Sequence, residues 1–310
     1  MKRLLITGAT GFLGRNILPH LSKNYDVTTT GRSENSKFEH SYMQCDLAEE
    51  KLPDESMEDW DVVVHAAGKA HVVPKTEEER KAFFDVNLEG TKNLAESLEE
   101  NPPKAFIFIS SIAVYGLDYG MDITEDAPLL AGDAYGKSKI RAEQFLTKWA
   151  NKHDVNLTIL RLPLVAGPDA PGNLGAMIKG IDTGKYLRIG EGSAQKSMVW
   201  AEDIAYAIPG LEKVSGVFNL TDGHNPSFKE LEDAIADRLD RKVRSLPKPL
   251  AYAVACAGSV INFVFRKRVF PLDQRAYSKI TKSLTVDDSK ARREFGWNSR
   301  RVVDMIIKQD

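Results

Sequence analysis

Tyr135 and Lys139 lie four residues apart, in the run Asp133-Ala134-Tyr135-Gly136-Lys137-Ser138-Lys139. If Tyr135 opens a helix, Lys139 lies one turn further along on the same face. A phenol has an ordinary pKa of about 10, and a neighbouring ammonium group favours its ionised form. The pair is therefore a candidate for acid/base chemistry near neutral pH. Because tyrosines and lysines are also common on solvated helix faces, the pair needs support from other motifs.

A glycine-rich turn follows the first apolar segment of the chain. Residues 2–7 are typical of a short buried strand, and an apolar-periodic helix is expected over 12–22. Between them, Gly8 permits a tight turn, Gly11 lets the backbone approach a pyrophosphate, and Gly14 packs the helix against the strand. The phosphates would meet the free amides at the positive end of that helix. The residues expected to bind a dinucleotide here are Gly8, Thr10, Gly11, Phe12, Leu13 and Gly14; an ordinary glycine turn is the alternative.

Five further motifs follow in order along the chain. They are Val-Val-Val-His-Ala-Ala-Gly at 62–68, Asn-Leu-Glu-Gly-Thr-Lys-Asn-Leu at 87–94, a strand with two serines at 106–116, Asp203 after Met-Val-Trp, and the segment 287–297, which runs from Asp-Asp-Ser to Phe-Gly-Trp. Together with the glycine turn and the Tyr-Lys pair, they resemble the extended short-chain dehydrogenase/reductase family, in its NAD(P)-dependent nucleotide-sugar epimerase/dehydratase branch. The resemblance spans nearly the whole chain. It implies an enzyme that acts on a nucleotide-activated sugar.

The resemblance implies a role for each residue of the catalytic site. Tyr135 is the acid or base at a sugar hydroxyl or carbonyl, and Lys139 lowers its pKa and bonds the nicotinamide ribose. Ser111 hydrogen-bonds the reacting oxygen. Because side chains alternate along a strand, only one of Ser110 and Ser111 can face the nicotinamide, and the family's spacing favours Ser111.

The resemblance also implies further cofactor contacts. Asp46 matches the family position that contacts adenine, with a surface aspartate at a strand end as the alternative. Asn87 either helps to order the active-site helix or is a structural residue, and Pro163 lies beside the nicotinamide. Beyond the glycine turn, the expected cofactor-binding residues are Arg32, Asp46, Leu47, Ala66, Ala67, Gly68, Asn87, Tyr135, Lys139 and Pro163.

The end of the second expected strand bears on the choice between NAD and NADP. An acidic residue there commonly holds the ribose 2′-hydroxyl of NAD. This chain has Gly31 followed by Arg32. Without a carboxylate, the 2′-phosphate of NADP meets no electrostatic repulsion at this position, and the guanidinium of Arg32 can pair with that phosphate. We therefore favour NADP over NAD, with a merely solvated Arg32 as the alternative.

The residues after Ser111 bear on the type of reaction. Dehydratases of this family carry an Asp-Glu pair there, which supplies an acid and a base for elimination of water. This chain has Ile112-Ala113, whose side chains cannot move a proton, so 4,6-dehydration is disfavoured. We expect an epimerase or closely related oxidoreductase that works through a 4-keto intermediate. The alternatives are an NADPH-dependent 4-keto-sugar reductase, a ketone reductase of a lipid, steroid or phenolic substrate, and a non-catalytic NADP sensor, which would usually lack the Tyr-Lys pair.

The substrate site is visible only in part. Asn173-Leu174 resembles the family segment that contacts the nucleotide diphosphate. Lys196 occupies a position where relatives often carry Arg. Lysine can neutralise a phosphate but cannot grip it bidentately. The expected substrate-binding residues are therefore Ser111, Asn173, Leu174, Lys196 and Arg188, with Lys279 and Lys282 as further candidates to compensate.

The elements that must position these residues alternate between strand and helix. Strands are expected near 2–7, 25–30, 41–45, 61–65, 104–110 and 156–161, and helices near 12–22, 77–100 and 135–152. This alternation predicts an α/β fold with a Rossmann-type, doubly wound parallel sheet. We expect a dinucleotide-binding domain over 1–165 and a smaller α/β substrate lobe over 166–310, some of whose segments return to the sheet.

Composition excludes several classes of function. The chain has 310 residues, 42% of them hydrophobic, and a net charge of −2, so it has no electrostatic footprint for nucleic acid. Its two cysteines and six histidines form no metal-ligand or disulfide pattern. A reducing cytoplasm is the expected location. The resemblance implies a homodimer through helices 77–100 and 135–150, for which apolar surface is available from Phe83, Phe84, Ile140, Phe145, Leu146 and Trp149, although several of these must face the sheet.

The stretch 250–265 contains no charged residue and is flanked by Lys248 and by Arg266-Lys267-Arg268. It is shorter than the roughly 20 residues of a membrane span. We expect a buried helix of the substrate lobe, or a lid over it, and no contact with a membrane. Attachment to a membrane surface, helped by the flanking cations, is the alternative.

Overall fold

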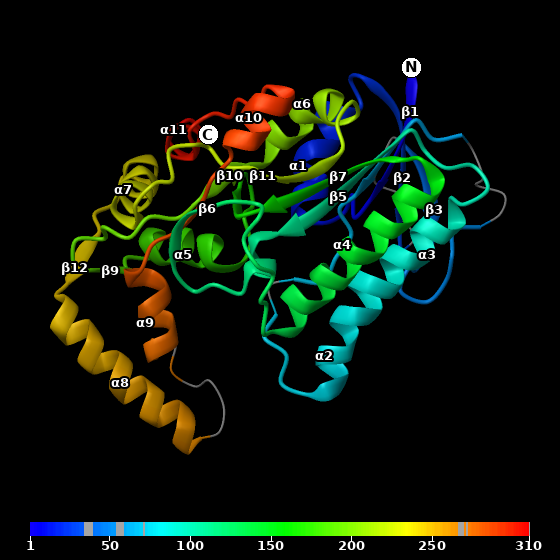
Figure 1. The fold of residues 1–310 in the computed structure, drawn as a ribbon. Helices are drawn as coiled ribbons and strands as arrows, with labels where there is room; N and C mark the ends of the chain where they lie inside the picture. Colours follow the sequence, from blue (N-terminus) through cyan, green and yellow to red (C-terminus); the bar gives the residue numbers. More distant parts are fainter. Residues whose placement is uncertain (34–39, 54–58, 71, 266–269, 271, 310) are drawn as a thin grey trace.

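The structure, a computed structural model, describes residues 1–33, 40–53, 59–70, 72–265, 270 and 272–309 (Figure 1). Its central sheet has seven parallel strands in the order β11-β7-β5-β4-β1-β2-β3. They are β1 (Lys2–Thr7), β2 (Tyr25–Gly31), β3 (Ser41–Gln44), β4 (Val62–His65), β5 (Ala105–Ser111), β7 (Asn156–Leu162) and β11 (Gly216–Asn219). The six strands predicted from the sequence are all present.

Helices cover both faces of this sheet (Figure 1). On β1, Leu4 and Ile6 belong to the core beneath α1 (Phe12–Leu21) and α6 (Ala201–Leu211). The intervening Leu5 belongs to the core beneath α3 (Gly90–Ser97) and α4 (Ala134–His153). This alternation between two apolar cores explains why the strands are apolar nearly throughout. The predicted Rossmann-type fold is confirmed.

The long helix expected over 77–100 is interrupted. It forms α2 (Glu77–Phe84), a π-helical turn over Asp85–Glu89, and α3. The wider turn carries Asn87, whose side-chain amide bonds the backbone of Lys69. Helical periodicity does not reveal such a turn, and the contact with Lys69 that accompanies it joins segments 18 residues apart.

The second part of the chain forms a smaller lobe whose strands also pair with the first part. Strand β11 extends the main sheet, and β13 (Leu284–Val286) pairs with β6 (Gly120–Ile123). The division near residue 165 therefore stays a prediction. The other elements of this lobe are β8 (Leu164–Ala166), α5 (Gly172–Asp182), β9 (Leu187–Ile189), β10 (Met198–Trp200), α7 (Phe228–Leu239), β12 (Arg244–Leu246), α8 (Lys248–Val264), α9 (Gln274–Thr281), α10 (Ser289–Phe295) and α11 (Val302–Ile307).

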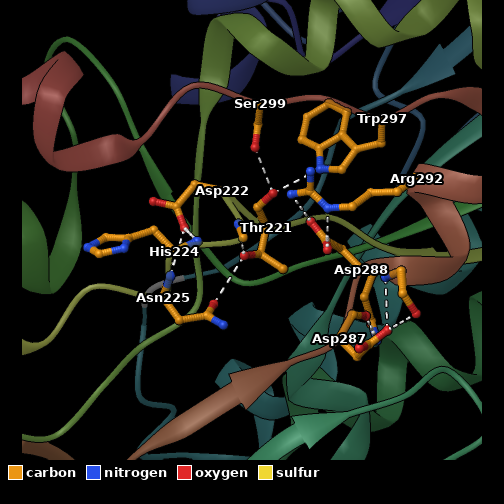
Figure 2. Close-up of polar contacts among 12 residues, drawn as sticks. Thr221, Asp222, His224, Asn225, Asp287, Asp288, Arg292, Trp297 and Ser299 are labelled. Carbon is orange, nitrogen blue, oxygen red and sulfur yellow. Dashed lines mark hydrogen bonds and ion pairs between the residues drawn. The ribbon is translucent and has the colours of Figure 1, made fainter.

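The C-terminal segment that resembles the family is tied to the loop after β11 (Figure 2). Trp297 Nε1 and Ser299 Oγ both donate to the carbonyl oxygen of Thr221, each at 2.8 Å. Arg292 donates to both carboxylate oxygens of Asp288, again at 2.8 Å. These contacts fasten the end of the chain to the end of the sheet, so this motif has a structural role here.

The prediction that 250–265 forms a buried helix is wrong in part. The stretch is helical, as α8, but Leu250, Val260 and Phe263 are exposed. Apolar composition alone could not distinguish a buried helix from one that carries apolar residues at the surface.

Candidate active site

Tyr135 lies in the first turn of α4, beside Ser111 at the end of β5. The helix is capped by Asp133, whose side chain accepts a hydrogen bond from Gly136 N at 2.9 Å. Ser111 Oγ accepts from Ala113 N at 3.2 Å and is also hydrogen-bonded to Tyr135. Because the backbone amide occupies one lone pair, the serine hydroxyl is free to donate to the phenol oxygen.

The expected lowering of the Tyr135 pKa is not the net effect in this structure. Burial of the phenol raises its pKa above the ordinary value, and the hydrogen bond with Ser111 opposes that rise. Desolvation disfavours the charged phenolate, and this effect outweighs the neighbouring donor. Tyr135 is therefore held in its protonated form at neutral pH.

Lys139 follows one turn later on α4 and is buried. Its Nζ donates to the carbonyl oxygen of Ile109 at 2.8 Å and lies 4.5 Å from the centre of the Phe108 ring. Burial lowers the pKa of Lys139 to about 8, while the negative charge of Glu143 acts in the opposite direction. The ammonium group thus stays charged at neutral pH and is held between α4 and β5.

Ser110 points away from this site, as the alternation of the strand requires. Its hydroxyl donates to Glu143, which forms a buried ion pair with Arg161 of β7 at 2.8 Å. Arg161 also donates to Tyr115 Oη at 3.3 Å. Sequence reasoning missed this buried pair, although a lone arginine inside an apolar strand and a glutamate one turn after Lys139 were visible signals. The pair links α4 to β7 directly behind Ser111 and Lys139.

The glycine turn forms a cradle that excludes side chains. Gly8 has φ +74°, and a Cβ there would lie 2.6 Å from Ala67 N. A Cβ at Gly14 would lie 2.2 Å from Gly8 O. Gly11 is the N-cap of α1 and has no side chain to cap it, so the first amides of the helix are available to an anion. A dinucleotide pyrophosphate fits this arrangement. Thr10 is exposed, whereas Phe12 and Leu13 are half-buried and pack against apolar cores.

A buried chain of hydrogen bonds connects this cradle to the active-site helices, and sequence reasoning assigned it no role. Thr91 Oγ1 donates to Asn87 O at 2.8 Å, so His65 Nε2, at 2.9 Å, must donate to Thr91. His65 Nδ1 then accepts from Thr7 Oγ1 at 2.6 Å, and Thr7 Oγ1 accepts from Ala67 N at 3.1 Å. Burial lowers the pKa of His65 to about 3, so the ring is neutral. The hydrogen-bond partners assign its single proton to Nε2.

Asn87 joins the turn after β4 to α4. Its Nδ2 donates to Lys69 O at 3.1 Å and to Ser138 Oγ at 2.9 Å, and its Oδ1 accepts from Lys69 N at 2.7 Å. Both amide protons are therefore used within the protein. Of the two roles considered from the sequence, this geometry favours ordering of the active-site helix. Ala66 and Ala67 are half-buried, and Gly68 is exposed beside Asn87 and Lys139.

The other expected cofactor residues lie at the ends of the strands. Asp46 accepts a hydrogen bond from Ala48 N at 3.1 Å, and Leu47 is buried in the core. Arg32 is exposed after β2, and Pro163 is buried between β7 and β8.

The expected substrate residues are brought together only in part. Arg188 forms ion pairs with Glu232 and Asp233, so in this structure its charge is already paired within the protein, and its role at the substrate stays a prediction. The side chain of Leu174 is buried in the core of the smaller lobe, whereas Asn173 is exposed in the first turn of α5.

Lys196, Lys279 and the backbone of Lys282 form a small cluster. Lys196 Nζ donates to Lys282 O at 3.0 Å. The pKa of Lys196 falls to about 8, mainly through burial and also through the positive charge of Lys279. The carboxylate of Asp118 lies 3.8 Å from Lys279 and acts in the opposite direction. An anion bound at Lys196 would further relieve its repulsion with Lys279.

Comparison with known proteins shows the family and the fold of this chain. The family model described as "NAD dependent epimerase/dehydratase family" matches residues 4–211. An N-acetyl-alpha-D-glucosaminyl-diphospho-ditrans,octacis-undecaprenol 4-epimerase from Escherichia coli O157:H7 is 30% identical over 80% of this chain and 76% of its own. A UDP-glucose 4-epimerase from Vibrio cholerae is 28% identical over 99% of this chain and 94% of its own. The crystal structure of UDP-N-acetylglucosamine 4-epimerase from Bacillus cereus superposes with a TM-score of 0.77, at 21% identity, covering 99% and 98% of the two chains.

Proposed function

Because this chain belongs to the NAD-dependent epimerase/dehydratase family, we propose that it is a nucleotide-sugar 4-epimerase that works through a 4-keto intermediate. The observation that carries the proposal is the convergence of Tyr135, Ser111 and Lys139 beside the glycine cradle. The names of the relatives support UDP-sugars as the substrate class. Of the two nicotinamide cofactors, either would accept hydride from C4 of the sugar and return it.

The catalytic residues would handle the proton on the 4-oxygen of the sugar. Ser111 would hydrogen-bond that oxygen, and Tyr135 would take its proton and later give it back. The phenol needs stabilisation of its anion to act as a base, since burial alone raises its pKa. The hydrogen bond from Ser111 already opposes that rise in the pKa. The charged Lys139, together with the positive charge that an oxidised nicotinamide would bring when bound, would supply the further stabilisation.

We also propose that 4,6-dehydration is not its reaction. Elimination needs two further proton-transferring groups near the sugar. Ile112 and Ala113 occupy the positions where dehydratases of the family carry Asp and Glu.

A lysine cluster would replace the usual arginine clamp on the substrate diphosphate. Lys196 and Lys279 repel each other, and a diphosphate would relieve that repulsion, while Lys282 is held close to Lys196 through its backbone. Exchange of Lys196 for glutamine should therefore raise KM for the nucleotide-sugar and leave cofactor affinity unchanged. Unchanged KM would remove Lys196 from the site.

For the cofactor, we propose a preference for NADP(H), on the basis of Gly31 and the exposed Arg32. The name of the family, which specifies NAD, favours the opposite choice. Titration of both cofactors against the wild type and Arg32→Ala decides between them. Equal affinities that the substitution leaves unchanged would refute the preference.

The test of the proposed reaction is incubation with UDP-, dTDP- and GDP-sugars, with C4 configuration followed by NMR. An epimerase converts many equivalents of sugar with a trace of cofactor, whereas a 4-keto-sugar reductase consumes one NADPH per turnover. Absence of any change at C4 with all three sugar classes would refute the proposal. The Tyr135→Phe variant is the control for contaminating activity.

A polyprenyl-diphosphate-linked sugar is the second candidate substrate. By its name, the Escherichia coli relative acts on an undecaprenol-linked sugar, and α8 of this chain exposes apolar side chains. The same NMR assay with a short-chain polyprenyl-diphosphate sugar tests this candidate.

A further inference from the structure

Helices α8 and α9 form a hairpin that projects from the smaller lobe (Figure 1). Asn262 of α8 is hydrogen-bonded to the backbone of Phe270, shortly before α9: its side chain donates to Phe270 O at 3.0 Å and accepts from Phe270 N at 2.8 Å. Gln274 N donates to Ser259 Oγ at 2.9 Å. These contacts, with buried Ala251 and Ala255, define the inward face of α8.

The outward face of α8 is apolar as well. Leu250 is 53% exposed, Val260 61% and Phe263 83%. With exposed Ala253 and Ala257, they follow the 3-4-3-3 spacing of one stripe along a helix. A surface helix normally carries polar residues on its outer face, so an apolar stripe indicates a surface that another partner covers.

The charges around the hairpin indicate the partner. Residues 241–282 contain ten lysines and arginines and one acidic residue, Asp273, in a chain whose net charge is −2. Every one of these cations that the structure describes is exposed. An anionic surface would be attracted to this segment. A second copy of the same face would be repelled by it, which disfavours a symmetric dimer through α8.

We propose that the α8–α9 hairpin binds the surface of an anionic phospholipid bilayer. Helix α8 would lie along the interface, with Leu250, Val260 and Phe263 among the acyl chains and the surrounding cations at the headgroups. The hairpin would rest on the bilayer without crossing it, since no described helix is long and apolar enough to span a membrane.

This position would bring the membrane close to the lysine cluster. The last turn of α9 carries Lys279, and Lys282 follows directly, so the same short helix contributes to the hairpin and to the cluster around Lys196. Membrane binding depends only on the exposed residues of the hairpin and stands independently of the proposed reaction.

The test is co-sedimentation of the purified full chain with vesicles of phosphatidylcholine alone and of phosphatidylcholine with phosphatidylglycerol. We expect binding to the anionic vesicles, weakened by high salt because the attraction is partly electrostatic. Phe263→Asp should lower the partition coefficient about tenfold or more, because it removes a large apolar side chain from the interface. Arg275→Glu should weaken binding at low salt more than at high salt.

The matched control is Ile307→Asp on α11, since Ile307 is 51% exposed and lies outside the hairpin. This variant should bind vesicles as the wild type does. Absence of binding to anionic vesicles, or equal loss in Phe263→Asp and Ile307→Asp, would overturn the proposal. A third outcome would also overturn it: the wild type is a dimer by light scattering and binds no vesicles, and Phe263→Asp is a monomer. The apolar face would then be an interface between two copies of the chain. Turnover of a water-soluble nucleotide-sugar should be unchanged in Phe263→Asp, which separates this outcome from failure of the proposed reaction.

Discussion

Replacement of Lys139 by methionine should abolish turnover and yet stabilise the cofactor-free protein. Lys139 is 4% exposed, and burial lowers its pKa from 10.5 to about 8. At 1.36 kcal/mol per pH unit, burial of the charged side chain costs about 3 kcal/mol at neutral pH. Methionine removes the charge but leaves Ile109 O without its donor, a loss of about 1 kcal/mol. The expected net gain in the free energy of unfolding is about 2 kcal/mol at pH 7.

The pH dependence provides a sharper test. The folded-state pKa of Lys139 lies below the unfolded-state value, so between pH 8 and 10.5 the unfolded chain holds a proton that the native protein has lost. The free energy of unfolding of the wild type should therefore rise with pH across this window. The variant lacks this rise, so its advantage should shrink and then reverse as the pH approaches 10.5.

Urea unfolding at several pH values between 7 and 10 measures both effects. Lys137→Met is the matched control, because Lys137 is exposed on the same helix and should change stability little. If Lys139→Met is less stable than the wild type at pH 7, or if the two proteins show the same pH dependence, the assignment of Lys139 as a destabilising buried cation is wrong. Loss of cofactor affinity in the same variant would support its second role at the nicotinamide ribose.

The other predictions concern neighbouring contacts. Tyr135→Phe should lower turnover by about 10²–10⁴-fold with little change in cofactor affinity, measured by steady-state kinetics and cofactor titration; near wild-type turnover would refute its role. Glu143→Gln should lower the free energy of unfolding by about 3–5 kcal/mol, because it leaves the Arg161 guanidinium buried and unpaired; a change below about 1 kcal/mol in urea unfolding would contradict this. We expect a homodimer by light scattering, through the helices over 77–100 and 135–150, where Phe84, Ile140 and Phe145 are half-buried while Phe83, Leu146 and Trp149 are buried within the protein; a monomer at micromolar concentration would refute it.

The cofactor-binding half of the fold could be predicted closely from the sequence, because its signals are local. Each parallel strand is a short apolar run between turns, and each predicted strand lies within a residue of the observed one. The glycine turn is equally local, since the positive φ of Gly8 and the crowding at Gly14 restrict those positions to one residue type. The contact between Tyr135 and Ser111 could not be predicted from local signals alone; the family's spacing was needed to choose Ser111 over Ser110.

Contacts between distant segments could not be predicted in this way. The series of hydrogen bonds from Thr7 through His65 to Thr91 joins three separate elements of the fold. Their alignment with one another is set only when the sheet and its helices have folded. The ion pair of Arg188 is a similar case, because its partners lie on α7, more than forty residues along the chain. An exposed arginine and a half-buried, paired arginine look the same in a sequence, so the ion-pair partners of Arg188 could not be predicted.

Helix α8 shows why burial is harder to predict than helicity. Its apolar run predicts a helix equally well whether a protein core, a second chain or a lipid surface covers it. The inward face could not be recognised from the residue types, since Ala251 and Ala255 lie opposite Ala253 and Ala257 with the same side chain. What distinguishes the two faces is the packing of α9 against one of them. The cationic residues that surround α8 then favour an anionic surface over a protein core as the partner of the other face, because a protein core would have to bury or pair those charges.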